Sequence, residues 1–141
     1  MNLLNGVKLT KIAEATGSGT SQVDSSILDM SGFEGVVFFT NMATANAGNF
    51  IKATAGKVSN LSDGADLAGS KVTTGTSDEA VLLEIAKPLD RYIRCSAVRG
   101  AATVCGEIWA AQYGARTVPV TNSLTGTQIS KILASPAYGT A

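Results

Sequence analysis

Glycine and asparagine interrupt this chain roughly every 8 to 15 residues, and the segments between them are too short for ordinary helices. Those segments are rich in Val, Ile, Phe, Thr and Tyr, residues that fit the half-buried surface of a pleated sheet. The pattern therefore predicts an all-β domain. We expect its strands at residues 6–14, 22–30, 33–40, 49–55, 80–87, 90–98 and 103–113.

Two of these segments also predict which side chains face the core. Val36–Phe39 is apolar at every position, so this strand either lies centrally or packs its second face against a neighbouring subunit. In the segment 80–87, alternation places Val81 on the core face together with the residues two and four positions further on. Leu82 and Glu84 then point to the opposite face.

Length predicts one domain over residues 1–141, with an extended N-terminal segment at 1–25 and a C-terminal tail at 117–141. The small-residue segment 42–48 and the glycine-rich segment 56–79 are typical of surface loops. A short strand is expected within the longer loop, near Lys71–Thr73.

Eleven basic and eleven acidic residues balance, so the chain has no charge excess that would attract nucleic acid or an anionic membrane. Only 16% of the residues are charged, against about 25% in a typical soluble domain. This composition suits a protein that functions in an assembly. The N-terminus MNLLNGVKLTK shows neither a secretion signal nor a membrane anchor.

The chain contains no histidine, the side chain that serves most often in acid–base catalysis and metal binding. Asp63 and Asp66 resemble part of a calcium loop but lack its further oxygen ligands, and a turn explains Asp63-Gly64 more simply. The glycine-rich segments lack the lysine of a phosphate-binding loop. We therefore expect no catalytic residue, no cofactor and no metal, and not an enzyme.

The only two cysteines, Cys95 and Cys105, flank a break at Arg99-Gly100-Ala101. If this break is a three-residue hairpin loop, the two cysteines face each other across neighbouring strands. Two small buried residues are the favoured interpretation, and a disulfide is the alternative. Their spacing fits neither a zinc site nor a thiol oxidoreductase.

The same hairpin register places Arg91 opposite Trp109 and Ile93 opposite Glu107. An arginine over an indole would add a modest cation–π contact. The position opposite Ile93 requires a cation near Glu107, so we expect an ion pair of Glu107 with Arg91 or Arg94, either between strands or between subunits.

The apolar residues of the tail are Ile129, Ile132 and Leu133. A last edge strand or a helical turn that closes the core is the favoured interpretation of this run. The alternative is an arm that reaches a neighbouring molecule.

Five blocks, taken together in their order, carry a resemblance to a known family: FEGVVFFTNM, LSDGADLAGS, KPLDRYIRCSAVRG, QYGARTVPV and SPAYGTA. The chain resembles small proteins of tailed bacteriophages and prophages that are interpreted as capsid decoration or cement proteins. The likeness runs from about Asp29 to Ala141. None of the blocks is a catalytic signature.

The resemblance implies an antiparallel β-sandwich of the jelly-roll type that binds the outer surface of the capsid, often as a trimer. The implied partners are the major capsid protein and further copies of the chain, with synthesis in the host cytoplasm, where thiols stay reduced. Aromatic and arginine side chains dominate interfaces, so the candidate interface residues are Phe39, Trp109, Tyr113 and Arg116.

Two other readings remain open from the sequence. A tail, head-tail connector or fibre component shares the size and the β-content. A virion carbohydrate-binding module would present an aromatic platform, for which Trp109 is the candidate.

Overall fold

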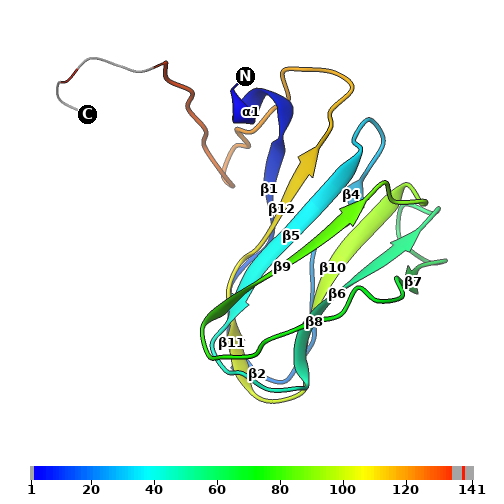
Figure 1. Cartoon of the computed structure of the whole chain (residues 1–141), viewed down its shortest axis with the longest axis vertical. Helices are drawn as coiled ribbons and strands as arrows, with labels where there is room; N and C mark the ends of the chain where they lie inside the picture. Colours follow the sequence, from blue (N-terminus) through cyan, green and yellow to red (C-terminus); the bar gives the residue numbers. More distant parts are fainter. Residues whose placement is uncertain (1, 135–137, 139–141) are drawn as a thin grey trace.

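Two antiparallel sheets pack face to face in this computed structural model, which describes residues 2–134 and 138 (Figure 1). Sheet A contains β1 (Lys8–Ala13), β2 (Thr16–Gly19), β5 (Gly35–Met42), β9 (Glu79–Ala86), β11 (Thr103–Cys105) and β12 (Ile108–Tyr113). Sheet B contains β3 (Val23–Asp24), β4 (Leu28–Asp29), β6 (Asn49–Gly56), β7 (Ala65–Asp66), β8 (Val72–Thr73) and β10 (Tyr92–Arg99). A single helical turn, α1 (Leu3–Gly6), precedes β1. The predicted all-β sandwich is confirmed.

The order of the strands is that of a jelly roll. In sheet A, β1 and β2 form one edge, β12 and β11 come next, and β5 lies between them and the other edge, β9. In sheet B, β3 and β4 form one edge, followed by β10, β6 and the short strands β7 and β8. The chain passes back and forth between the sheets, so each sheet is built from segments distant in sequence.

The core lies between the two sheets, and β5 is its central element. Val36 and Phe38 are fully buried against sheet B, whereas Val37 and Phe39 lie on the opposite face of sheet A and are half-buried. The neighbouring strand β9 alternates as predicted, with Val81 buried and Leu82 exposed.

Two expected strands are each divided in the structure. The segment 22–30 becomes β3 and β4, because the Ser25 hydroxyl, in addition to the Ser25 backbone, bonds the main chain of Cys95 and disturbs regular pairing there. The segment 103–113 becomes β11 and β12, because its register against β5 shifts by one residue between Cys105, opposite Met42, and Trp109, opposite Phe39. Gly106 lies at this shift, where a side chain would overlap Asn41. In contrast, β2 in TGSG carries no apolar alternation and was not expected.

The predicted hairpin is wrong. β10 ends at Arg99 in sheet B, and β11 begins at Thr103 in sheet A, so the break carries the chain from one sheet to the other. Gly100 makes this crossing close to Gly48, where a Cβ on Gly100 would lie 2.9 Å from the Gly48 Cα. The expected pairings of Cys95 with Cys105, of Arg91 with Trp109 and of Ile93 with Glu107 therefore do not form.

The expected ion pair of Glu107 with an arginine does not form between strands of the chain. Arg91 makes a two-pronged contact with Asp29, at 2.9 and 2.7 Å, and thereby joins β4 to the start of β10. Arg94 lies 3.4 Å from Asp24. The cation beside Glu107 is instead a lysine of β1, Lys11, at 3.5 Å.

Arg99 is buried at the end of the sandwich where the chain crosses. Its guanidinium donates to the carbonyl oxygens of Ser21, Gly17 and Thr103 at 2.6, 2.8 and 3.0 Å, and to the Thr16 hydroxyl at 3.3 Å. One side chain thus fixes the β2–β3 connection against the start of β11.

The N-terminal segment 1–25 contains the strand expected at 6–14 and the beginning of the strand expected at 22–30. The N-terminal segment is part of the sandwich, since it supplies β1 and β2 to sheet A and β3 to sheet B. Over its described residues, 117–134 and 138, the tail neither adds a strand nor closes the core, because Ile129, Ile132 and Leu133 are all exposed. Residues 135–137 and 139–141 lie outside the described residues, and with them most of the SPAYGTA block.

Neighbouring phenylalanines of β5 provide a test of this architecture. Phe38→Ala should lower the free energy of unfolding by about 3–5 kcal/mol, because it opens a cavity between the sheets. Phe39→Ala should cost no more than about 1 kcal/mol, because its side chain faces outward. Urea unfolding of both variants measures the difference, and equal costs would contradict the assigned orientation of β5.

Candidate interaction surface

The outward surface of sheet A carries a group of apolar side chains, which we call the apolar face. One row across the strands runs from Trp109 on β12 through Phe39 on β5 to Leu82 on β9. The adjacent row brings together Leu9, Ala111 and Val37. The apolar face is thus defined by Leu9, Val37, Phe39, Leu82, Trp109 and Ala111.

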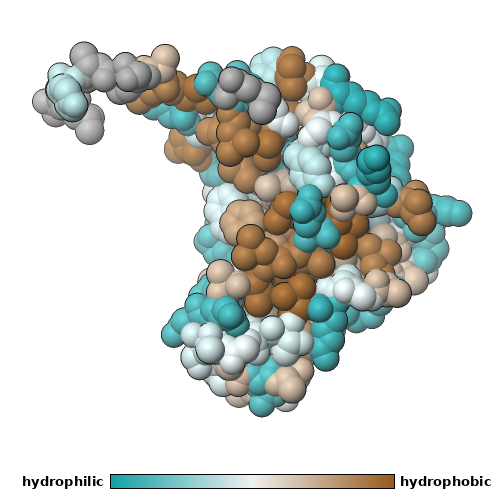
Figure 2. Space-filling view, viewed as in Figure 1, coloured by the Kyte–Doolittle hydropathy of each residue, from teal (hydrophilic) through white to brown (hydrophobic). Residues whose placement is uncertain are grey.

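Solvent reaches all of this face. Leu82 is 60% exposed, and the other five side chains are half-buried. Figure 2 shows the apolar side chains as a brown area over the middle of β5 and β9. Contiguous exposed apolar surface of this kind commonly marks an interaction site.

The polar atoms of the aromatic residues on this side of sheet A already have partners within the chain. The indole nitrogen of Trp109 donates to Glu107 at 3.0 Å, and the hydroxyl of Tyr113 donates to Glu84 at 2.6 Å. The bond to Glu84 raises the pKa of Tyr113. An apolar partner could therefore cover the rings without stripping a polar group of its hydrogen bond.

The border of the apolar face is acidic. Glu14 and Glu107 flank Lys11 along β1 and β12, and Glu84 lies beyond Val37 on β9. The hydrogen bond from Lys11 to Glu14 raises the pKa of that lysine. The ammonium group of Lys11 is thus paired with carboxylates of its own chain. Three carboxylates therefore lie along this border beside Lys11, and Lys131 of the tail is the second cation near it.

Two side-chain amides of the tail cover the free edge of β1, an arrangement we call the amide clamp. Asn122 accepts from the Leu9 N–H at 2.6 Å and donates to the carbonyl of Val7 at 2.9 Å. Gln128 accepts from the Lys11 N–H at 3.0 Å and also donates to the Leu9 carbonyl. The clamp does for β1 what a neighbouring strand would do.

A groove of about 320 Å³ lies where the tail meets the apolar face. Leu9 and Trp109 form its floor on the sheet side, and Ile129 and Lys131 border it on the tail side. The tail therefore leaves the domain next to one corner of the apolar face.

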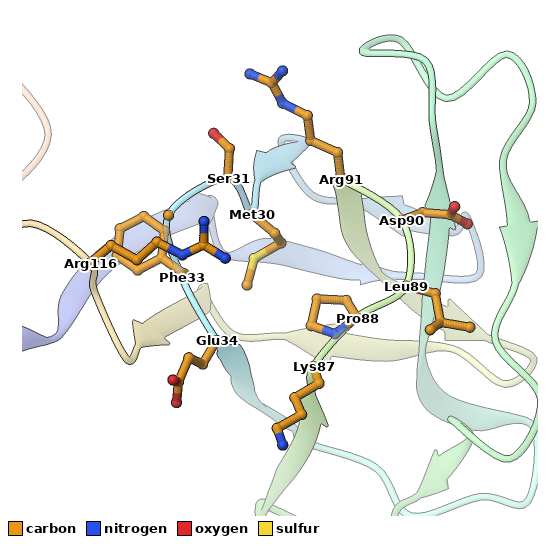
Figure 3. Close-up of a pocket in the computed structure, with 11 residues that line it drawn as sticks. Met30, Ser31, Phe33, Glu34, Lys87, Pro88, Leu89, Asp90, Arg91 and Arg116 are labelled. Carbon is orange, nitrogen blue, oxygen red and sulfur yellow. The ribbon is translucent and has the colours of Figure 1, made fainter.

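Phe39, Trp109 and Tyr113 thus lie on the same side of sheet A, as candidates for one interface, whereas Arg116 lies elsewhere. Arg116 borders a hollow of about 480 Å³ at an end of the sandwich, together with Met30, Phe33 and Pro88 (Figure 3). Sequence reasoning did not nominate Leu82, although its outward position follows from the alternation of its strand.

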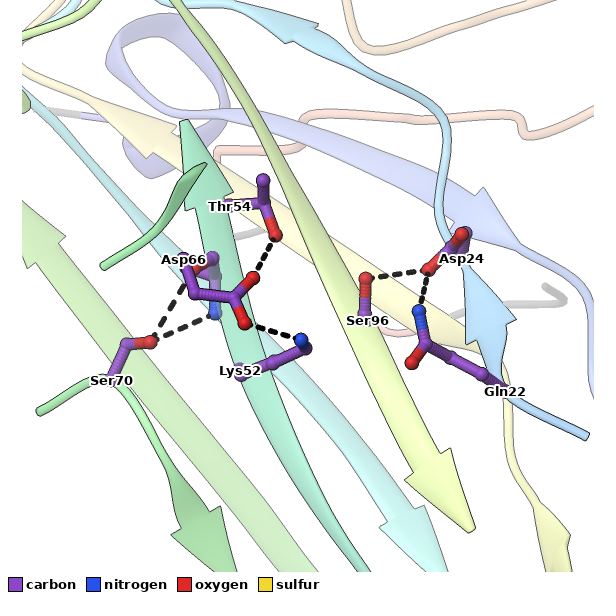
Figure 4. A network of polar contacts seen from close by, with 8 residues as sticks. Gln22, Asp24, Lys52, Thr54, Asp66, Ser70 and Ser96 are labelled. Atoms are coloured by element: carbon purple, nitrogen blue, oxygen red, sulfur yellow. Dashed lines mark hydrogen bonds and ion pairs between the residues drawn. The ribbon is translucent and has the colours of Figure 1, made fainter. Parts of the chain in front are cut away.

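The outward surface of sheet B has the opposite character. Asp66 accepts from Thr54 at 2.8 Å and pairs with Lys52, and Ser96 donates to Asp24 at 2.6 Å (Figure 4). The contact with Lys52 lowers the pKa of Asp66. These charges pair with one another on a solvated surface, so sheet B offers no comparable apolar face.

Both cysteines are buried free thiols, which agrees with the reading of two small buried residues and not with a disulfide. They belong to different sheets, and Cys105 lies 3.9 Å from the Thr40 hydroxyl. Burial raises the pKa of Cys95 to about 12 and raises that of Cys105 as well.

Asp63 and Asp66 do not converge on a calcium site. Asp63 accepts from the backbone N–H groups of Lys57 and Val58, which lowers its pKa and closes a turn. Over residues 2–134 and 138, no three His, Cys, Asp or Glu side chains gather as metal ligands would. No helix in the same residues has the length and apolarity to cross a membrane.

Comparison with known proteins leaves the family open. No protein-family model matches the chain, and no curated protein matches it at a significant level.

The thiols provide a test of the core. At pH 8 the folded protein should react with a thiol reagent far more slowly than the unfolded chain, because both sulfurs are buried and protonated. An exposed control, Ser62→Cys, should react at once. Rapid labelling of Cys95 or Cys105 in the folded protein would contradict their burial.

The same thiols predict a dependence of stability on pH. Their folded-state pKa lies above the ordinary value of about 8.5, so they contribute stability below that pH. This contribution should be lost as the pH rises from about 8.5 toward about 12, the folded-state pKa of Cys95. Urea unfolding of Cys95→Ala beside the parent at several pH values measures it; equal slopes would contradict the shift.

The amide clamp predicts a cost for losing either side chain. Asn122→Ala should lower the free energy of unfolding by about 1–3 kcal/mol, because it leaves main-chain groups of β1 unpaired. Thr127→Ala, an exposed neighbour in the tail, should change it by less than about 0.5 kcal/mol. Thermal and urea unfolding measure both, and equal effects would show that the clamp adds nothing.

Proposed function

We propose that this protein is a structural component of a bacteriophage virion, a decoration or cement protein that binds the outer surface of the assembled capsid as a trimer. Its implied partners are the major capsid protein and further copies of itself. The five sequence blocks support this family, and the apolar face is the observation that carries an assembly role.

The apolar face is surplus to the folding of a single chain. The jelly-roll core is closed by side chains that point between the sheets, such as Phe38 and Ile51, which are fully buried. Phe39, Trp109 and Leu82 point the other way, and a lone soluble domain gains nothing from exposing them together. A partner that covers them would remove apolar surface from water, the usual main driving force of association.

The remaining surface suits a protein that is packed among copies of itself. The formal net charge is zero, so identical copies do not repel one another strongly. The loop 56–79 is largely exposed and the loop 42–48 is exposed in part, and both are rich in small residues. Such loops can lie across the seams of a shell, and binding only to the assembled lattice would shift the equilibrium against its opening.

A protein partner fits the groove beside Trp109 better than a glycan does. A sugar site needs polar groups free to bond hydroxyls, but the side-chain amides of Asn122 and Gln128 are already bonded to β1. The indole N–H is held by Glu107. The carbohydrate-binding alternative is therefore the weaker one. The alternative of a tail, connector or fibre component differs from the proposal in where the protein is located on virus particles, which can be observed directly.

Co-sedimentation with matching capsid shells that lack the protein tests this proposal. We expect saturable binding, and shells that withstand heat better once occupied. Binding to isolated tails or to a glycan array, with none to shells, would overturn it in favour of one of the alternatives.

A variant of the apolar face adds a second readout. Leu82→Asp should lower shell occupancy at least about tenfold, because it places a charge on the apolar face and so weakens the association of copies that binding as a trimer requires. Leu89→Asp, a fully exposed leucine away from this face, should bind as the parent does. If Leu82→Asp bound shells normally, the apolar face would not be the assembly surface.

A further inference from the structure

We propose that the tail segment 129–134 of one copy docks on the apolar face of a second copy of this chain, so that copies join head to tail. The inference deepens the proposed function. It rests on that proposal only for the number of copies that join, which is three. It concerns contact between copies in solution and needs no shell.

The first argument is where the tail segment begins. The amide clamp holds the tail against β1 as far as Gln128. Ser130 still bonds Ser123 at 3.0 Å, and Ile129 and Lys131 border the groove beside Trp109. Beyond Lys131, the residues up to 134 extend away from both sheets (Figure 1). The clamp therefore fixes the point from which a short arm leaves the domain, which lowers the entropy lost when the arm binds.

The second argument is that the arm is apolar yet uncovered. Ile129 is 95% exposed, Leu133 60% and Ile132 42%. Three large aliphatic side chains within five residues contact nothing that buries them, although the domain that carries them has an apolar face of its own left open. The tail segment therefore lacks a surface that covers it, and the apolar face lacks a segment that covers it.

The third argument is charge. Lys131 is the only charged side chain in residues 117–134, and it lies between the aliphatic residues of the arm. The border of the apolar face carries Glu14, Glu84 and Glu107 beside Lys11, and in the single chain Lys131 itself lies at the groove beside Trp109. An arm with one positive charge thus complements a face with an acidic border.

The geometry of the contact predicts a ring. Each copy offers one arm and one face, and these are different surfaces, so the contact is heterologous. Heterologous contacts close into rings when the rotation between copies permits it. A closed ring of three copies is the form that the proposed function requires.

Two full-length variants separate the arm from the face. The face variant is Leu82→Asp, and the arm variant is Ile132→Asp with Leu133→Asp. All three positions are exposed in the single chain, so circular dichroism and thermal unfolding should match the parent. Thr127→Asp, an exposed tail residue before the arm, controls for the added charge.

Light scattering across a concentration series provides the readout. The parent and Thr127→Asp should form an oligomer of the size of a ring. The face variant and the arm variant, each measured alone, should associate at least tenfold more weakly and stay monomeric at concentrations where the parent assembles. A mixture of the face variant and the arm variant should form a dimer, because the intact arm of the first can dock on the intact face of the second.

Several results would overturn the inference. One is a mixture that stays monomeric while the parent assembles, which would mean that the arm does not bind a second copy. Another is a parent that is monomeric throughout the concentration series. A third is an arm variant that assembles normally yet loses shell binding, which would assign the arm to the shell. A parent that assembles through the arm but binds no shell would refute the proposed function and leave the inference standing.

Discussion

The structure depends on one constraint, a central strand that is apolar on both of its faces. β5 has neighbours on both sides in sheet A, and its inward residues Val36 and Phe38 form the middle of the core. Sheet B covers that side and nothing in the described chain covers the other. A sandwich covers each sheet on one side only, so the second apolar surface of β5 stays in contact with solvent in the single domain.

The strands themselves were predictable from the sequence because glycine and alternation are local signals. The inward face of β9 followed from alternation alone, and the apolar run of β5 indicated either a central place or a second face packed against a neighbouring subunit. The divisions at Ser25 and Gly106 did not follow from such patterns, because each depends on contacts with distant residues, such as Cys95 for Ser25. The crossing at Gly100 was not predicted, for a related reason. A hairpin loop and a passage between sheets have the same local sequence pattern, and only the strands that pair with β10 distinguish them.

The candidate surface was predictable in part. Aromatic residue type nominated Phe39, Trp109 and Tyr113, and the sheet register brings them to one side of the molecule. The same criterion nominated Arg116, which borders a separate hollow. Nothing in the sequence indicated the amide clamp, since Asn122 and Gln128 lie more than a hundred positions from the strand they cover.

Arg99 shows how one end of the sandwich is secured. A carboxylate partner would make this contact sensitive to acid and to screening by salt. Its acceptors are instead neutral, three backbone carbonyls and one hydroxyl, and a guanidinium does not lose its proton in the accessible range of pH. Neither protonation nor counter-ions can therefore switch the contact off, and this end of the molecule should hold the same shape in media as different as a cell interior and open water.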